Sequence, residues 1–474
     1  MSSDVVVIGA GIAGWTTALG LRRAGATVTL VTKGVGGLPL SNGTLDVLGH
    51  LGGAAGPAGP GAGAGLEERS RRRAVTHPYA AIADTELLPE GHPYRVLGPE
   101  RVRRGVDDLI DLVGEELLVR PEATADPADP ANLWLPTAVG AVHPTAVIQP
   151  SMRASVLRDG GRYLVVGLAR LKDLAPELVA GNLSRTDLPG GGRVEARAVT
   201  VDLEVRPGDH DTSALEHARA LDDPAVADRL AAAIAPHLRD GETVLLPAVL
   251  GLADPAVAER LAERLGAPVG EIPLAPPSVP GLRLENRLSR LAMDERVRVV
   301  QGGRVIDHER VGDRLVSVSS ASAGHPTRHR GGAFVLAAGG FESGALTMTS
   351  HGEVTDTVLG LPLAGVSADG AENLRRLIHS DYWGSPQGLF RTGVAVDDAM
   401  HPLGPDGTPV LTNVHAVGGV LAGGLLLRLI VDVDRHLAVV PAYEVDPGVA
   451  DRGDQVGAEV HRRPVAPVDG LQHS

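Results

Sequence analysis

The first part of the chain alternates short apolar runs with a glycine turn. Residues 4–8 are a β-branched run, which is typical of a strand buried on both faces of a parallel sheet. Residues 12–23 carry apolar side chains at helical spacing, Gly25 follows where a helix-ending glycine is expected, and residues 27–31 are a second buried-strand run. This pattern predicts one complete βαβ unit.

The rest of the chain continues with strand and helix patterns. Four further apolar runs predict buried strands, the last two of them rich in glycine at their ends: 163–167, 243–246, 333–340 and 411–424. Residues 224–234 and 255–265 have helical spacing with a proline near the first turn, and residues 296–319 predict short strands joined by turns. The sequence therefore predicts an α/β fold.

The order of these elements predicts two domains, one inserted into the other. A chain of 474 residues is too long for one compact core. We expect the first domain to be built from residues 1–150 and 281–424, with an inserted α/β domain over 151–280. Residues 425–474 are expected to form an atypical C-terminal tail, because prolines and charged residues surround its short apolar run.

Composition and charge exclude several classes of function. The formal net charge is -14 and only 2% of residues are aromatic, which argues against nucleic acid as a partner. The chain has no cysteine, so disulfides, thiolate catalysis and cysteine-ligated iron–sulfur clusters are excluded within this polypeptide. No cluster of histidines has metal-ligand spacing, and no metal site is predicted. Redox chemistry would need a bound organic cofactor.

The apolar segments bear on localisation. The N-terminal MSSDVVVIGAG has no basic residue ahead of its apolar run, so it does not look like a signal peptide. The longest apolar stretch, residues 417–427, is well short of the ~20 residues that span a bilayer. We expect a cytoplasmic protein.

The strongest chemical signal is the fingerprint formed by Gly9, Gly11 and Gly14. The first glycine allows a tight turn out of the strand, the second lets a pyrophosphate approach the backbone, and the third permits close packing of helix on strand. The helix start also offers free N–H groups and the positive end of its dipole to an anion. Because the motif lies between the required strand and helix, it predicts dinucleotide binding.

The second predicted strand ends without the carboxylate that usually binds a ribose hydroxyl, which disfavours NAD. Thr32 and Lys33 stand there instead. This hydroxyl and cation are similar to those of several succinate dehydrogenase and fumarate reductase flavoproteins. Ser41 and Gly43 resemble the segment of those enzymes that passes over the flavin ring and diphosphate, although the same residues would also suit a polar turn.

A longer resemblance extends from Gly9 to Gly424. The chain resembles the B subunit of anaerobic glycerol-3-phosphate dehydrogenase, in the superfamily of fumarate reductase and succinate dehydrogenase flavoproteins. Beside the fingerprint, the matching stretches are VTKG (31–34), LSNGTLDVLGH (40–50), HPYRVLGPERV (92–102), LPAVLGLAD (246–254), LAPPSVPGLRLENRL (274–288), FVLAAGGFESGAL (334–346) and NVHAVGGVLAGG (413–424). The stretch at 274–288 is the most specific, because no generic dinucleotide fold requires it.

The resemblance implies a Rossmann-like flavin-binding domain and a biochemical role. The cofactor would be FMN, with FAD as the alternative. The reaction would be a quinone-linked oxidation of sn-glycerol 3-phosphate to dihydroxyacetone phosphate. The partners would be the flavoprotein A subunit and the iron–sulfur C subunit of the same complex, which would pass on the electrons and hold the complex peripherally at the inner membrane.

The resemblance also completes the set of candidate site residues. Cofactor contacts are expected from Gly9, Gly11, Gly14, Thr32, Lys33, Ser41, Gly43, Ala338, Gly339, Gly418 and Gly419. The catalytic residues are unknown. Arg283 and His50 lie in family-like segments and could bind phosphate or move a proton, while a structural role is the alternative for each.

The chain departs from the family after Gly424. Related proteins continue with a glycine-rich turn and a helix that points at the flavin pyrimidine, whereas this chain reads LLLRLIVDVDRHLAVVPAYEV. Two alternatives therefore stay open. The chain could be a non-catalytic component for electron transfer and assembly, or it could be a flavin-free scaffold.

Overall fold

The computed structural model describes residues 2–51, 73–120, 129–378 and 387–423. Its largest sheet has seven strands in the order β11-β2-β1-β14-β13-β12, and β17 also pairs with β14. These strands are β1 (Ser2–Ile8), β2 (Val28–Thr32), β11 (Arg298–Gln301), β12 (Val305–Val311), β13 (Arg314–Ser320), β14 (Thr327–Leu336) and β17 (Val414–Ala416). The predicted α/β class is confirmed.

The centre of this sheet is parallel. β1 pairs in parallel with β2 on one edge and with β14 on the other, and β11 and β17 extend the parallel part outward. Val6 and Val7 are fully buried, as the β-branched run of β1 predicts for a strand covered on both faces. β12 and β13 join as an antiparallel extension, because the predicted turns at 296–319 bring the chain straight back on itself.

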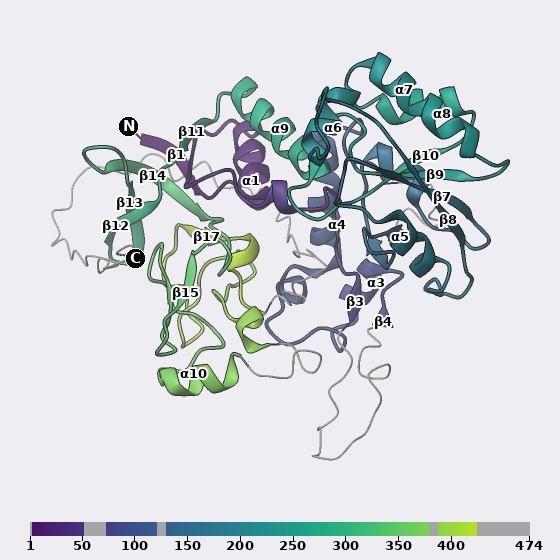
Figure 1. Cartoon of the computed structure of the whole chain (residues 1–474). Helices are drawn as coiled ribbons and strands as arrows, with labels where there is room; N and C mark the ends of the chain where they lie inside the picture. The colour runs from purple at the N-terminus through teal and green to yellow at the C-terminus, as the bar shows by residue number, and fades with distance from the viewer. Residues whose placement is uncertain (1, 52–72, 121–128, 379–386, 424–474) are drawn as a thin grey trace.

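Helix α1 (Ile12–Arg23) completes the predicted βαβ unit. Gly25 has a φ of +96° and follows the helix end, as expected for a helix-ending glycine. Helices α9 (Val279–Asp294) and α4 (Pro93–Val113) contact α1, and α4 is broken at Gly98, just before Pro99. Figure 1 shows α1, α9 and α4 between the seven-stranded sheet and a second sheet.

The second sheet is wholly parallel, with strand order β10-β9-β7-β8. Its strands and helices are β7 (Arg162–Leu168), α5 (Pro176–Leu183), β8 (Glu195–Val201), α6 (Ala214–Leu221), α7 (Pro224–Ile234), β9 (Thr243–Pro247), α8 (Val257–Leu265) and β10 (Val269–Ile272). Helix α8 begins two residues later than predicted from Pro255, and Ala256 occupies its N-cap position.

Smaller elements complete the described chain. They are α3 (Pro78–Ala83), α10 (Gly370–Arg376), and three short antiparallel pairs: β3 (His50–Leu51) with β4 (Arg73–Ala74), β5 (Leu133–Pro136) with β6 (Val142–Thr145), and β15 (Leu346–Met348) with β16 (Val354–Asp356). No helix of the described residues is long and apolar enough to cross a membrane.

The buried apolar side chains form two large clusters. One contains residues of 5–147 together with residues of 284–421, and the other contains residues of 157–279. The predicted domain limits at 150, 280 and 424 remain a prediction. The predicted atypical tail, 425–474, lies outside the described residues, and so does the missing helix start expected after Gly424.

Candidate functional site

A cavity of about 490 Å³ opens at the carboxyl ends of the parallel strands. Its wall includes the turns that follow β1, β2, β14 and β17, so it crosses the sheet where strand connections leave in opposite directions. Ligands of open α/β sheets bind in such a crevice. We call it the central cavity. The residues after these four strands line it, together with 40–42, 44, 46, 92–94 and 303–305.

The three fingerprint glycines have different surroundings. A Cβ at Gly9 would lie 2.1 Å from the carbonyl oxygen of Ala337, and one at Gly14 would lie 2.0 Å from the carbonyl oxygen of Gly9. A Cβ at Gly11 would meet no protein atom within 4 Å, and Gly11 lines the central cavity. Gly9 and Gly14 are therefore needed for packing, whereas the space over Gly11 suits a ligand that approaches the backbone.

The start of α1 suits a bound anion. Gly11 is the N-cap residue and supplies no side-chain cap, and the first turn has no acidic residue. The first N–H groups of α1 are therefore left to another acceptor, and the helix dipole favours a negative charge there. This arrangement fits the diphosphate of a dinucleotide.

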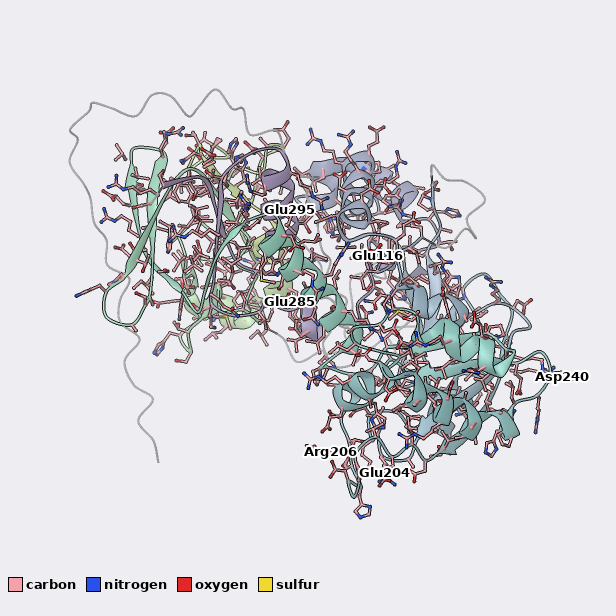
Figure 2. The ribbon with its side chains drawn as sticks, turned by 90° about the horizontal axis from the view of Figure 1, so that it is seen from above. Glu116, Glu204, Arg206, Asp240, Glu285 and Glu295 are labelled. Atoms are coloured by element: carbon pink, nitrogen blue, oxygen red, sulfur yellow. The ribbon has the colours of Figure 1, made fainter. Side chains whose placement is uncertain are left out.

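Two polar contacts hold α1 in place, one with a residue of α9 and one with the residue that caps the C-terminus of α9. The indole N–H of Trp15 donates to Glu285 over 3.3 Å, and Arg23 forms an ion pair with Glu295 at 2.8 Å. Figure 2 shows Glu285 within α9 and Glu295 at the end of that helix. Burial raises the pKa of the Glu285 carboxyl, although hydrogen bonds from Ser289 and Trp15 act in the opposite direction. The glycine turn is thus fixed by a rigid helix pair.

Thr32 and Lys33 line the cavity on its β2 side. The Thr32 hydroxyl is engaged with its own turn, since it donates to the Gly34 carbonyl over 2.5 Å and accepts from the Gly34 N–H over 3.2 Å. Its observed contacts stabilise the turn that carries Lys33. Arg304, from the turn between β11 and β12, adds a second cation to this side of the cavity.

Ser41 lines the cavity, but Gly43 does not. The Ser41 hydroxyl donates to the Leu38 carbonyl and accepts from the Gly43 N–H, so it shapes the loop. A Cβ at Gly43 would lie 2.4 Å from the Pro280 side chain, and φ is +75° there. Gly43 therefore allows the loop to pack against the start of α9.

The glycine-rich ends of β14 and β17 form the opposite side of the cavity. Ala338, Gly339, Gly418 and Gly419 all line it. Gly339 and Gly418 have φ values of +82° and +74°, a region where residues with a Cβ are strained.

Arg283 and His50 do not line the central cavity. The Arg283 side chain is largely buried, donates to Glu271 through two hydrogen bonds of 2.7 and 2.9 Å, and also donates to the Gly251 carbonyl. His50 lies in β3, paired with Ala74. Gly14, another predicted site residue, does not line the cavity either.

Sequence reasoning missed several polar residues of the cavity wall. They are Asp46, His92, Tyr94, Arg304 and Glu342. The first three occur in the family-like stretches 40–50 and 92–102, so the resemblance pointed to their segments without singling them out. Glu342 likewise lies in the family-like stretch 334–346, whereas Arg304 reaches the cavity through tertiary packing and no local pattern marks it. Within the described residues, no group of three potential metal ligands lies together.

The comparisons agree with this geometry. The model of the FAD binding domain family matches residues 4–426. A probable B subunit of anaerobic glycerol-3-phosphate dehydrogenase from Halobacterium salinarum (strain ATCC 29341 / DSM 671 / R1) is 31% identical over 436 residues, covering 89% of this chain and 92% of the relative. The B subunit of anaerobic glycerol-3-phosphate dehydrogenase from Pectobacterium carotovorum subsp. carotovorum (strain PC1) is 30% identical over 436 residues, covering 89% and 93%.

Among solved structures, a 3-ketosteroid-delta4-(5alpha)-dehydrogenase from Rhodococcus jostii RHA1 is 11% identical with a TM-score of 0.38, over 93% of this chain and 94% of that chain. The family assignment depends on the sequence matches. The chain belongs to the FAD binding domain family of flavoprotein oxidoreductases and, within it, to the family of anaerobic glycerol-3-phosphate dehydrogenase B subunits.

Proposed function

We propose that the central cavity holds FAD, with its diphosphate at the start of α1. The observation that supports this most is that the cavity extends to both sides of the glycine turn. Thr32, Lys33 and Arg304 line the β2 side, and Gly339 and Gly418 line the β14 and β17 side. FMN, the cofactor first expected from the sequence, would need only one side. FAD needs both, because its adenosine and its ring extend in opposite directions from the diphosphate.

In this proposal the residues of the chain bind and orient the cofactor. The N–H groups at the start of α1 bind phosphate oxygens, and Lys33 and Arg304 supply positive charge beside the adenosine half. The turns after β14 and β17 present backbone to the ring. When bound, the flavin supplies the acceptor for two electrons from an oxidised substrate.

The proposed reaction is the quinone-linked oxidation of sn-glycerol 3-phosphate to dihydroxyacetone phosphate. The names of the relatives support it, and this chain covers 92% and 93% of their lengths. The partners would be the flavoprotein A subunit and the iron–sulfur C subunit of the complex. An external electron acceptor is required, because the sequence contains no cysteine for an iron–sulfur cluster of its own. Through the iron–sulfur partner, a cytoplasmic protein would be held peripherally at the membrane.

The test begins with the purified full chain. Cofactor released by denaturation should be identified by chromatography as FAD, and FMN alone would contradict the proposed cofactor. Anaerobic addition of sn-glycerol 3-phosphate should bleach the oxidised flavin band, whereas its enantiomer, sn-glycerol 1-phosphate, should not. A colourless protein would favour the flavin-free scaffold. Bleaching that requires the flavoprotein partner would favour the electron-transfer and assembly role.

Reversing the charge of Lys33 should weaken cofactor binding. Lys33 lines the cavity, so Lys33→Glu would place a carboxylate beside the phosphate or ribose groups of FAD. A repulsion of about 1.4 kcal/mol is enough to raise the Kd tenfold. Lys172→Glu is the matched control, because Lys172 is exposed and does not line the cavity. Equal flavin-to-protein ratios in the two purified variants would contradict the role of Lys33.

A further inference from the structure

A buried carboxylate–imidazole pair lies at the wall of the central cavity. Asp46 lines the cavity, and its Oδ2 lies 3.1 Å from Nε2 of His143. The two side chains are only 8% and 5% exposed. A buried pair of this kind can accept a proton and spread the resulting charge over two groups.

The backbone around the pair is firmly held. The Leu45 N–H donates to the Val147 carbonyl over 2.9 Å, and the Val147 N–H donates back to the Leu45 carbonyl over 3.1 Å. The Thr145 hydroxyl donates to that same Leu45 carbonyl. His143 lies in β6, and Asp46 directly follows Leu45, so this pairing sets the distance between the two side chains.

A third polar group lies beside the carboxylate. The Thr44 hydroxyl lies 3.1 Å from Oδ1 of Asp46 and 2.9 Å from Oδ1 of Asn42, while Oδ2 of Asp46 faces His143. Tyr94 of α4 is a further titratable group that the charge of Asp46 influences, and the His92 ring lies beside the Tyr94 ring, tilted by 52° with ring centres 5.1 Å apart. Burial raises the pKa of the Tyr94 phenol, and the nearby Tyr79 and Asp46 act in the same direction. Tyr94 therefore keeps its proton beside the carboxylate.

The segment that leads into α4 lies on the side of the cavity that suits the flavin ring. Sheet order places β2 and β11 on one side of the glycine turn and β14 and β17 on the other. A Cβ at Gly423, beyond β17, would lie 2.4 Å from the Gly91 carbonyl oxygen, so the segment that carries His92 and Tyr94 packs against the β17 side. Asp46 is close enough to Tyr94 to influence its ionisation.

The other acidic and basic groups of the wall are less suited to accept a proton there. Glu342 is exposed to solvent. His92 uses Nδ1 to accept the Tyr94 N–H over 3.0 Å, as the N-cap of α4, where the helix dipole disfavours a positive charge. Lys33 and Arg304 stand on the adenosine side and are cations.

We propose that Asp46 and His143 together accept the hydroxyl proton of the alcohol that this protein oxidises. The inference depends on the proposed function. The substrate O–H and C–H bonds break and a C=O bond forms. A bound flavin would accept the electron pair of the C–H bond as hydride, and the proton would pass to Asp46, stabilised by His143, and then to solvent. Asp46 is the catalytic residue, and His143 is its positioning residue.

The test compares Asp46→Asn, Asp46→Ala and His143→Gln with the wild type as flavin-loaded full chains. The flavin-to-protein ratio is measured first and should stay at the wild-type value. Anaerobic reduction by sn-glycerol 3-phosphate should then be about 100-fold slower or more in Asp46→Asn, as is typical when a general base is lost. His143→Gln should be reduced more slowly than wild type and should show a shifted pH profile. Added formate should partly restore Asp46→Ala, because it replaces the missing carboxylate.

Asp129→Asn is the matched control. Asp129 forms an ion pair with His77 at the same distance, 3.1 Å, but the two side chains are 31% and 53% exposed, and neither lines the cavity. This variant should be reduced at the wild-type rate.

The outcomes separate the two proposals. If sn-glycerol 3-phosphate bleaches the flavin of Asp46→Asn as fast as that of the wild type, the role of the pair is overturned. The proposed function then still stands. A flavin-loaded wild type that sn-glycerol 3-phosphate does not bleach overturns both. If Asp46→Asn does not retain flavin, the His143→Gln variant tests the proposal instead, because it keeps the Asp46 carboxylate in the cavity wall. An unchanged rate and pH profile in that variant overturns the proposal.

Discussion

Replacing Gly11 by valine should give a folded protein that has lost most of its flavin. The backbone of Gly11 has a φ of -73°, which any residue can adopt, and a Cβ there would meet no protein atom. The added side chain would instead occupy the space expected for the diphosphate. Overpacking of this kind costs about 1–3 kcal/mol, so the Kd for FAD should rise about tenfold or more. The flavin-to-protein ratio and the thermal midpoint of the apoprotein measure the two effects separately.

Gly14→Ala is the contrasting variant within the same motif. Its Cβ would lie 2.0 Å from the Gly9 carbonyl oxygen, so the fold itself must shift. We expect a lower thermal midpoint in Gly14→Ala and an unchanged one in Gly11→Val. Wild-type flavin content in Gly11→Val would mean that the diphosphate binds elsewhere.

Breaking the buried pair of Arg283 and Glu271 should have the largest effect on stability. The Arg283 side chain is 9% exposed and that of Glu271 is fully buried, at a distance of 2.7 Å. Arg283→Met would leave a buried carboxylate without its cation, which costs about 3–5 kcal/mol of the free energy of unfolding. Urea denaturation measures the loss.

The control is an exposed pair with a similar distance. Arg193 and Asp187 lie 2.6 Å apart, but their side chains are 66% and 69% exposed. Arg193→Met should therefore change the free energy of unfolding by only about 0–1 kcal/mol. Equal losses in Arg283→Met and Arg193→Met would contradict the importance of burial.

The stabilisation by Arg283 should also depend on pH. Burial alone would raise the pKa of Glu271, but the charge of Arg283 and hydrogen bonds from Arg283, Ser151 and the Leu250 N–H hold it below its ordinary value of 4.5. The unfolded chain therefore binds a proton at higher pH than the folded chain. The stabilisation is fully present above the unfolded value and is lost as pH falls through the folded one. The difference in unfolding free energy between wild type and Arg283→Met should shrink in acid and stay constant near neutral pH.

Arg283 shows where local sequence patterns stop being informative. Its segment, 274–288, carries the most specific family resemblance, and this suggested phosphate binding or proton transfer. The structure places Arg283 between Glu271, the Gly251 carbonyl and Gln149. Gln149 in turn donates to the carbonyls of Gly43 and Pro280, so this network supports the loop that lines the cavity. Its partners come from distant parts of the chain, and no spacing in the sequence predicts such a contact.

The sequence by itself determined the βαβ unit around Gly9, Gly11 and Gly14, because strand period, helix period and turn chemistry are properties of neighbouring residues. Only the tertiary structure decided which of these glycines faces open space, which loops complete the cavity, and that Asp46 lies beside His143. The last of these facts depends on the segment that follows β6 pairing with the loop at 40–46, as Leu45 does with Val147. Contacts between residues so far apart are set by the packing of whole elements, which a single sequence does not record.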